Sequence, residues 1–269
     1  MKKKITLLLL VIVIVFVAYQ VRQSWFTRYE MVELPVLEGY VASSGLMINN
    51  QGYVLGECLR PDPNASPSED EEENMDVLWN RAQEPIPIQI DGYFNALNDA
   101  NQIAGYVGDT TFHQACVYDT TSGLRIIDIP DATQTWGCDI NNEGTVLVYG
   151  TVVSETGWET GTVFGWDIRE EKEIFRFPLL CSWVNLELND EGTVAGIIRR
   201  PPSEMGDLFR FHSQGGLEIL KDTLSTPGSV NLNDQGTISF RGDFKNYIIL
   251  EGDFIDIHLN DTDWFTATI

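Results

Sequence analysis

The chain has 269 residues, with 17 Lys and Arg against 40 Asp and Glu and a formal net charge of −23. Five of the basic residues and none of the acidic ones lie in the first 28, so residues 29–269 carry 12 basic and 40 acidic residues, a net charge of −28. A field this negative disfavours binding to nucleic acid or to anionic lipid surfaces, and we expect no nucleic-acid partner.

The N-terminus has the composition of an export signal. Lys2, Lys3 and Lys4 precede an apolar stretch over residues 5–21, whose 17 residues are at the low end for a membrane span. No Ala-x-Ala-like cleavage site and no nearby Cys follows. We predict a signal anchor and short linker over residues 1–28, with the lysines in the cytoplasm. The domain over residues 29–269 would then lie outside the cytoplasm, in the periplasm or at the cell surface. Alternatively, the signal is cleaved and the domain is secreted.

A short motif recurs along the rest of the chain, with the form apolar–Asn–(Asn/Asp)–x–Gly–x–(Val/Ile). Its anchoring asparagines are Asn49, Asn98, Asn141, Asn189, Asn233 and, in a weaker copy, Asn260, separated by 49, 43, 48, 44 and 27 residues. Four short strands with their turns occupy roughly 40–45 residues in a propeller blade. The spacing therefore predicts one blade for each copy.

The motif has the chemistry of a tight β-hairpin. An Asn side chain bonds the backbone further along the turn, and Gly supplies the positive φ that a type I turn plus bulge needs. Asn101 and Asp263 replace Gly in two copies, and Asn and Asp tolerate that conformation better than most residues. We therefore interpret these positions as structural and not catalytic. The turn residues are Asn49, Gly52, Asn98, Asn101, Asn141, Gly144, Asn189, Gly192, Asn233, Gly236, Asn260 and Asp263.

Alternating apolar segments fill the space between the hairpins, and none of them has a helical period. The pattern predicts an all-β chain after the N-terminal membrane helix, a β-propeller with blades of about four antiparallel strands. If the strands of a blade are numbered one to four, with the Asn turn between strands one and two, residues 31–37 are expected to form an isolated fourth strand. The sixth copy of the motif would supply strands one and two of a further blade. We expect six blades, with five as the alternative.

The pattern resembles the HAF family of extracellular repeat proteins, in which Ala-x-x-Ile-Asn-x-x-Gly-x-Val-x-Gly hairpins alternate with His-Ala-Phe-x-Trp segments. The hairpins match in five places, including the trailing glycines Gly56, Gly105, Gly150 and Gly196. The His-Ala-Phe triplet, from which the family takes its name, matches poorly. The resemblance covers about residues 30–269. It implies an exported β-propeller-like domain and no catalytic residues.

Strand order separates two ends of the predicted sheets. The turns between strands one and two and between strands three and four lie at one end, and the more variable loops lie at the other. An acidic, Pro-rich insertion over residues 57–76 belongs to the variable end, and we expect it to be flexible. Binding of a cation or a basic partner is its alternative role.

Two sets of side chains are candidate ligand contacts at the variable end. The first set precedes strand one of each blade and consists of Tyr40, Phe94, Trp136 and Trp183, which either stack on a ligand or seal neighbouring blades. The second is the basic pair Arg199 and Arg200, which either binds a carboxylate or pairs with local acids.

The sequence contains no nucleophile motif, phosphate loop or zinc signature. Its four cysteines, Cys58, Cys116, Cys138 and Cys181, allow three disulfide pairings, and no metal or cofactor is expected. We predict an exported domain that binds an unknown protein or carbohydrate. The alternative is a propeller glycoside hydrolase, which requires acidic side chains that converge in the axial channel.

Overall fold

The computed structural model describes residues 32–60, 73–109, 111–154, 157–179, 184–199, 205–224, 228–242, 245–250 and 253–257. The chain divides into two units, Met1–Leu34 and Pro35–Ile269. The second unit holds every described strand.

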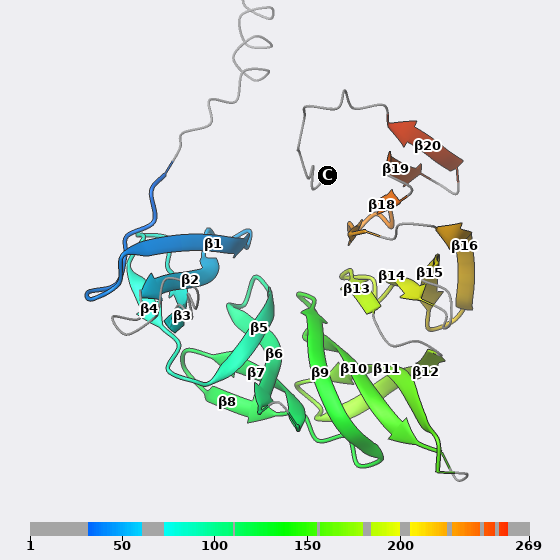
Figure 1. Ribbon diagram of the computed structural model, residues 1–269, viewed down its shortest axis with the longest axis horizontal. Coiled ribbons are helices and arrows are strands. Elements are labelled where there is room, and N and C mark those ends of the chain that lie inside the picture. Colours follow the sequence, from blue (N-terminus) through cyan, green and yellow to red (C-terminus); the bar gives the residue numbers. More distant parts are fainter. Residues whose placement is uncertain are drawn as a thin grey trace, which may run out of the picture. The chain divides into compact units, whose positions relative to one another are not determined.

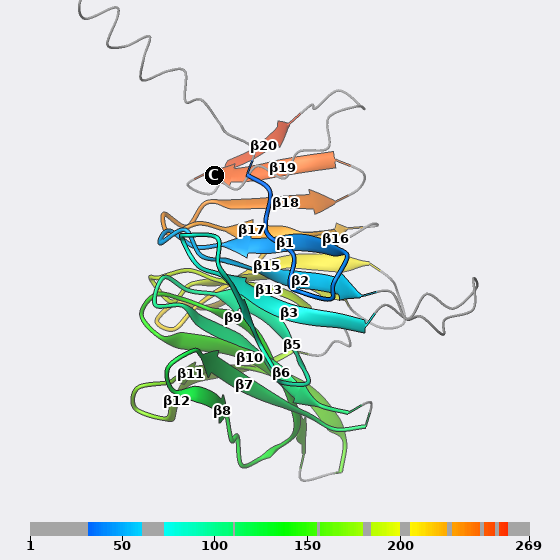
Figure 2. The ribbon, with the colours of Figure 1, turned by 90° about the vertical axis from the view of Figure 1, so that its left-hand side faces the viewer.

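Five four-stranded antiparallel sheets follow one another along the chain, each made of four consecutive strands (Figures 1 and 2). Blade 1 contains β1 (Ala42–Ile48), β2 (Val54–Arg60), β3 (Glu73–Trp79) and β4 (Pro85–Pro87). Blade 2 contains β5 (Gly92–Leu97), β6 (Gln102–Gly108), β7 (His113–Asp119) and β8 (Gly123–Ile126). Blade 3 contains β9 (Ala132–Ile140), β10 (Thr145–Val153), β11 (Glu159–Asp167) and β12 (Lys172–Leu179).

The last two sheets repeat this order. Blade 4 contains β13 (Val184–Leu188), β14 (Val194–Arg199), β15 (Gly206–His212) and β16 (Gly216–Leu224). Blade 5 contains β17 (Val230–Leu232), β18 (Ile238–Gly242), β19 (Lys245–Leu250) and β20 (Asp253–Ile257). The first strands of successive blades contact one another, and in blades 2, 3 and 4 they lie on the inside with the fourth strands outside (Figure 1). The described residues form an all-β, five-bladed β-propeller.

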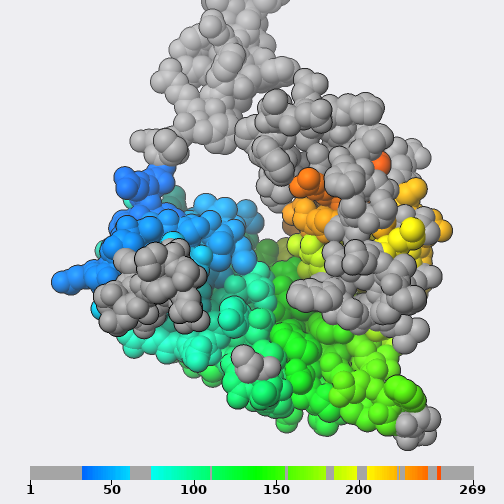
Figure 3. Space-filling model, viewed as in Figure 1, coloured from blue at the N-terminus to red at the C-terminus, as the bar shows by residue number. Residues whose placement is uncertain are grey.

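The core lies between blades. Each of four clusters of buried side chains joins two consecutive blades; for example, Val117 of blade 2 packs with Val146 and Phe164 of blade 3. Figure 3 shows the cyan-to-green atoms of blades 2 and 3 packed directly against each other. A blade buries apolar side chains on both sheet faces because each face meets a neighbour. This explains why consecutive residues of a middle strand are buried, as are Ala115, Cys116 and Val117 of β7.

Asparagine side chains also join the blades, in what we call the Asn ladder. In each of the four blade pairs, Nδ2 of the anchoring Asn donates to the backbone carbonyl of the next anchoring Asn. The bonds are Asn49 to Asn98 (2.9 Å), Asn98 to Asn141 (3.1 Å), Asn141 to Asn189 (3.0 Å) and Asn189 to Asn233 (3.1 Å).

The residue after each anchor adds a second bond to the Asn ladder. Its backbone N–H donates to the side-chain oxygen of the equivalent residue in the next blade. These bonds are Asn50 to Asp99 (2.8 Å), Asp99 to Asn142 (2.7 Å), Asn142 to Asp190 (2.7 Å) and Asp190 to Asp234 (3.1 Å). The repeated dipeptide therefore connects blades as well as turning the chain.

The turns themselves have the geometry that Asn and Gly favour. The φ values are +80° at Gly52, +81° at Gly144, +75° at Gly192 and +78° at Gly236, and Asn101 has φ +61°. Within each turn the anchoring Asn Oδ1 accepts a backbone N–H four residues on, as from Thr145 to Asn141 at 2.8 Å. Asn260 and Asp263, the turn of the sixth copy, lie outside the described residues.

Replacing Gly192 with Ala tests this reading of the turn. No atom lies within 4 Å of the Cβ that the substitution would add. The only energetic cost is therefore that of holding alanine in the left-handed backbone conformation. We expect a loss of about 1 kcal/mol in the free energy of unfolding, measured by urea denaturation, and a smaller loss for Gly192→Asn. The neighbouring exposed Glu191→Ala is the control, and an equal loss in all three variants would contradict the assignment.

Several expectations differ from the structure. Five blades are described and not six. Residues 32–37 form no strand, although a lone fourth strand was expected there; Pro35 offers no N–H, and its carbonyl instead accepts Trp79 Nε1 at 2.8 Å. The insertion over residues 57–76 is partly regular, since Glu57 pairs with Asp76 and Arg60 with Glu73. Its middle part, residues 61–72, lies outside the described residues.

Among the described residues, no helix is long and apolar enough to cross a membrane. The expected anchor, residues 5–21, lies outside them.

Candidate functional site

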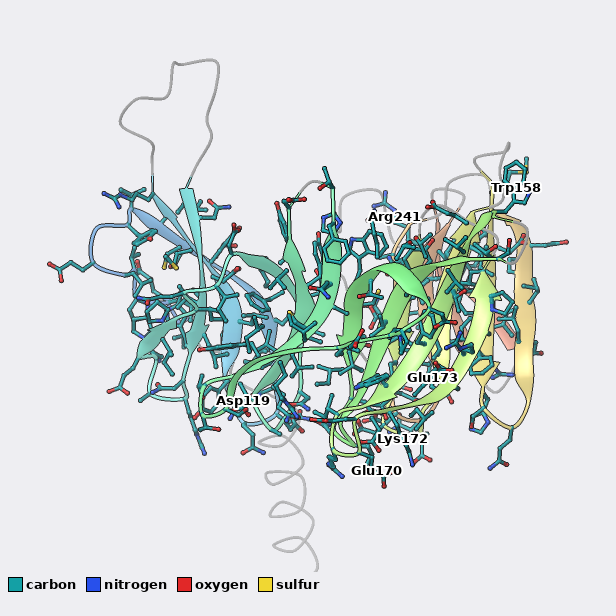
Figure 4. The ribbon with its side chains drawn as sticks, turned by 90° about the horizontal axis from the view of Figure 1, so that it is seen from below. Asp119, Trp158, Glu170, Lys172, Glu173 and Arg241 are labelled. Atoms are coloured by element: carbon teal, nitrogen blue, oxygen red, sulfur yellow. The ribbon has the colours of Figure 1, made fainter. Side chains whose placement is uncertain are left out.

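The connections between strands lie at two opposite ends of the blades, which we call the turn face and the loop face. Asp119 ends a third strand, and Glu170 and Lys172 lie where a third strand is followed by a fourth. Arg241 lies at the end of a second strand, and Trp158 immediately precedes a third strand. Figure 4 shows the first three at one edge of the domain and the last two at the opposite edge. The turn face holds the Asn turns, and the loop face holds the irregular connections.

Five ring side chains form a continuous series across blades 2 and 3, which we call the aromatic row. Its members, in order, are Tyr93 of β5, Tyr106 of β6, His113 of β7, Trp136 of β9 and Tyr149 of β10. Their successive ring-centroid distances are 5.2, 5.2, 5.3 and 5.7 Å. Such separations are those of favourable aromatic contacts, so the rings support one another.

Strand register explains how these rings meet. Tyr93 is paired with Tyr106 across β5 and β6, and Trp136 with Tyr149 across β9 and β10. His113 bridges the two pairs, and its Nδ1 lies 3.4 Å from Gln134 Oε1 of blade 3. The row therefore crosses the junction between two blades.

The row presents both ring faces and polar edges. Tyr93 is 64% exposed, and the other four rings are half-buried. Burial raises the pKa of the Tyr106 phenol, with smaller contributions from Tyr93 and Cys138, so this hydroxyl stays protonated and can donate a hydrogen bond. Gly161 leaves room for the last ring, because a Cβ there would lie 2.5 Å from Tyr149 Oη.

The four aromatic residues predicted to contact a ligand do not share one environment in the structure. Trp136 is in the aromatic row. Phe94 instead lies in the core that joins blades 1 and 2, only 6% exposed and 6.2 Å from the Tyr118 ring, so it is not available to a ligand. Tyr40 precedes β1 and is half-buried, and its N–H donates to Leu37 O. Trp183 lies outside the described residues.

The predicted basic pair is only partly described. Arg199 ends β14, and nothing is described of its side chain. Arg200 lies outside the described residues. Tyr93, Tyr106, His113 and Tyr149 were missed by the sequence analysis. Their signal is weak, because adjacent aromatics such as Tyr93 and Phe94 point to opposite sides of a strand and sequence alone does not say which is buried.

A second group of interest is a pair of carboxyls between blades 3 and 4. Asp139 of β9 and Glu187 of β13 occupy equivalent positions, two residues before the anchoring Asn. Asp139 Oδ2 accepts the Leu188 N–H at 2.6 Å, and its Oδ1 accepts the Ile140 N–H at 2.8 Å. The side chain therefore connects the first strands of two blades.

Both carboxyls ionise less readily than usual. Burial raises the pKa of Glu187 to about 8, and repulsion from Asp139 adds to the effect. Burial likewise raises the pKa of Asp139 to about 6, although its two backbone hydrogen bonds oppose the change. The two carboxyls repel each other when both are ionised, so ionisation of one favours the protonated form of the other.

Among the described residues, no group of three or more His, Cys, Asp and Glu side chains has a metal-binding arrangement. Cys58, Cys116 and Cys138 are free thiols, and Cys181 lies outside the described part of the chain. Burial raises the pKa values of both Cys116 and Cys138 to about 12, as expected for inert thiols.

No family model matches the sequence, and a search of curated proteins finds no match either. Solved structures do match the fold. Acylaminoacyl peptidase from Pyrococcus horikoshii has a TM-score of 0.56 and 14% identity over 81% of this chain and 39% of its own. The β-propeller domain of the Trilobed protease from Pyrococcus furiosus, described as having an open velcro topology, has a TM-score of 0.55 and 14% identity. That match covers 82% of this chain and 73% of the domain.

The chain thus spans about two fifths of the first peptidase. At 14% identity the likeness shows the β-propeller fold alone.

Proposed function

We propose that the protein is an exported, membrane-anchored β-propeller that binds a ligand through the aromatic row. The anchor is the apolar stretch over residues 5–21, and the resemblance to the HAF family supports export. The observation that carries the binding role is the row itself, five contacting rings across two blades with Tyr93 largely exposed. Carbohydrate suits this surface best, because sugars combine apolar ring faces with hydroxyls that phenol, imidazole and amide groups can bond.

Removal of Trp136 and Tyr93 tests the proposal. The paired substitutions Trp136→Ala and Tyr93→Ala are expected to weaken binding at least tenfold, about 1.4 kcal/mol, because the stacking surface is lost. The measurement is a fluorescence titration with soluble oligosaccharides, and with a peptide set as the comparison. Trp158→Ala is the matched control, since Trp158 is exposed on the loop face but outside the row. Unchanged affinity in the double variant would remove the row from the binding site.

A second candidate function is glycoside hydrolysis, which the carboxyl pair favours. Two neighbouring carboxyls with raised pKa values can retain a proton near neutral pH, as the acid of a glycoside hydrolase must. The bonds from Ile140 and Leu188 to Asp139 equally suit a structural role. Release of reducing sugar by the wild type and its loss in Asp139→Asn and Glu187→Gln would support the enzyme; no release from any oligosaccharide would exclude it for those substrates.

A further inference from the structure

The two ring nitrogens of His113, at the centre of the aromatic row, have different surroundings. His113 Nδ1 lies 3.4 Å from Gln134 Oε1 of blade 3. His113 Nε2 has no hydrogen-bond partner among the described residues, and protein atoms do not enclose it. One nitrogen is therefore engaged by the neighbouring blade, and the other is open to a ligand.

A second contact of Gln134 decides which atom of its amide faces the imidazole. Gln134 Nε2 donates to the Thr111 carbonyl oxygen at 3.2 Å. A carbonyl oxygen only accepts, so the NH₂ group must point to Thr111 and Oε1 must point to His113. Because Oε1 also only accepts, the facing Nδ1 carries the hydrogen. In the neutral imidazole the other nitrogen, Nε2, is then a hydrogen-bond acceptor.

The backbone beneath these groups holds blades 2 and 3 close together. Ala115, two residues after His113, donates its N–H to Thr135 Oγ1 at 2.8 Å. A Cβ on Gly137 would lie 2.3 Å from Gly105 O, so the two strands approach more closely than any side chain allows. The imidazole and the rings beside it are thus positioned before a ligand arrives, which reduces the entropic cost of binding.

A fixed negative charge lies beside the row. Asp109 Oδ1 accepts the Thr111 hydroxyl at 2.6 Å and the Thr111 N–H at 2.7 Å. These bonds, the one from the hydroxyl first, hold the pKa of Asp109 below its usual value, and the carboxylate is close enough to His113 for their charges to interact. Together with the net charge of −23 on the chain, this carboxylate disfavours an anionic ligand here.

We infer that Gln134 is a positioning residue that fixes His113 Nε2 as an acceptor, and that the ligand is a neutral oligosaccharide whose hydroxyl donates to this nitrogen. The assignment rests on the proposed binding role of the aromatic row and narrows its ligand to a sugar without a carboxylate at this point. The exposed faces of Tyr93 and Trp136 take up the apolar faces of the sugar rings. A ligand group that only accepts would meet the Nε2 lone pair and be rejected.

Long-range ¹H–¹⁵N NMR of the full chain at about pH 8 tests the acceptor without a ligand. The His113 signals, assigned by their loss in His113→Phe, are expected to be those of the Nδ1–H tautomer. Gln134→Met removes the facing oxygen and should move the population toward the Nε2–H tautomer. Gln114→Met makes the same change on the next residue of β7 and should leave it unmoved. A wild type dominated by the Nε2–H tautomer would overturn the inference whether or not a sugar binds.

Titrations with cellohexaose, maltohexaose and hexagalacturonate at physiological salt test the ligand. At least one neutral sugar should bind at least tenfold more tightly than hexagalacturonate. His113→Phe keeps a ring but removes the acceptor and should weaken that binding about tenfold, Gln134→Met should weaken it about threefold, and Gln114→Met should not.

Two results would contradict the hydroxyl contact: tighter binding of hexagalacturonate, or unchanged affinity in His113→Phe. Absence of binding to all three sugars would refute the binding role proposed for the row and the sugar assignment with it. The tautomer of His113 distinguishes these cases, because it reports on Gln134 and not on the ligand.

Discussion

Replacing Asn141 with alanine is expected to lower the free energy of unfolding by about 3 kcal/mol. Asn141 is 5% exposed, its Nδ2 donates to Asn189 O at 3.0 Å, and its Oδ1 accepts the Thr145 N–H at 2.8 Å. Alanine leaves both partners buried without the bonds they make now, which costs more than the bonds themselves contribute. Thermal and urea denaturation measure the loss.

Two further variants separate the inter-blade bond from the turn. Asn141→Asp keeps an oxygen for Thr145 but removes the Nδ2 donor and places a carboxylate near the Asn189 carbonyl, so we expect it to destabilise about as much as alanine. Glu143→Ala changes an exposed residue of the same turn and should cost little. If Asn141→Asp were as stable as the wild type, the Asn ladder would contribute nothing and only the turn would matter.

Glu187→Gln is expected to stabilise the protein at pH 8 and to leave it nearly unchanged at pH 4. The pKa of Glu187 is about 8 in the fold against an ordinary value of 4.5, and that of Asp139 is about 6 against 3.8. A carboxyl with a raised pKa contributes its full stability below the unfolded pKa and loses it as the pH rises through the folded pKa. The wild type therefore loses stability between about pH 4 and pH 8, and a neutral amide at 187 removes most of that loss.

The size of the effect follows from the shift. One pKa unit corresponds to about 1.4 kcal/mol, so the rise from 4.5 to about 8 limits the gain at pH 8 to about 4 kcal/mol. The measurement is urea denaturation at several pH values. Asp76, whose pKa burial and Glu57 raise to about 6, titrates in both proteins and cancels in the difference. Glu143→Gln is the control from an exposed site, and a variant with the same pH profile as the wild type would show that Glu187 is not the buried acid.

Much of the fold could be predicted from local features of the sequence. Strand content, four strands to a blade and the propeller fold follow from the period of the motif and from the two-residue alternation, which need no tertiary information. The turns follow for the same reason, since the positive φ at Gly52 and Asn101 is a local backbone requirement. Blade number was less accessible, because a repeat copy in the sequence does not say whether it completes a four-stranded sheet.

The candidate site depended on register and on neighbours. The pairing of β5 with β6 shifts register between Phe94 and Ala96. Phe94 is buried, whereas the adjacent Tyr93 is exposed. For the same reason, Trp136 was predicted but its partners Tyr106, His113 and Tyr149 were not. The carboxyl pair is a similar case, since Asp139 and Glu187 are 48 residues apart in the chain and meet only because first strands of successive blades adjoin.

The sequence by itself thus determined the repeating hairpin, because Asn and Gly act on backbone within four residues of themselves. Only the tertiary structure decided what the same asparagines do between blades. Their Nδ2 groups reach carbonyls 43 to 49 residues away, and no local pattern distinguishes a side chain that closes its own turn from one that also bonds its neighbour.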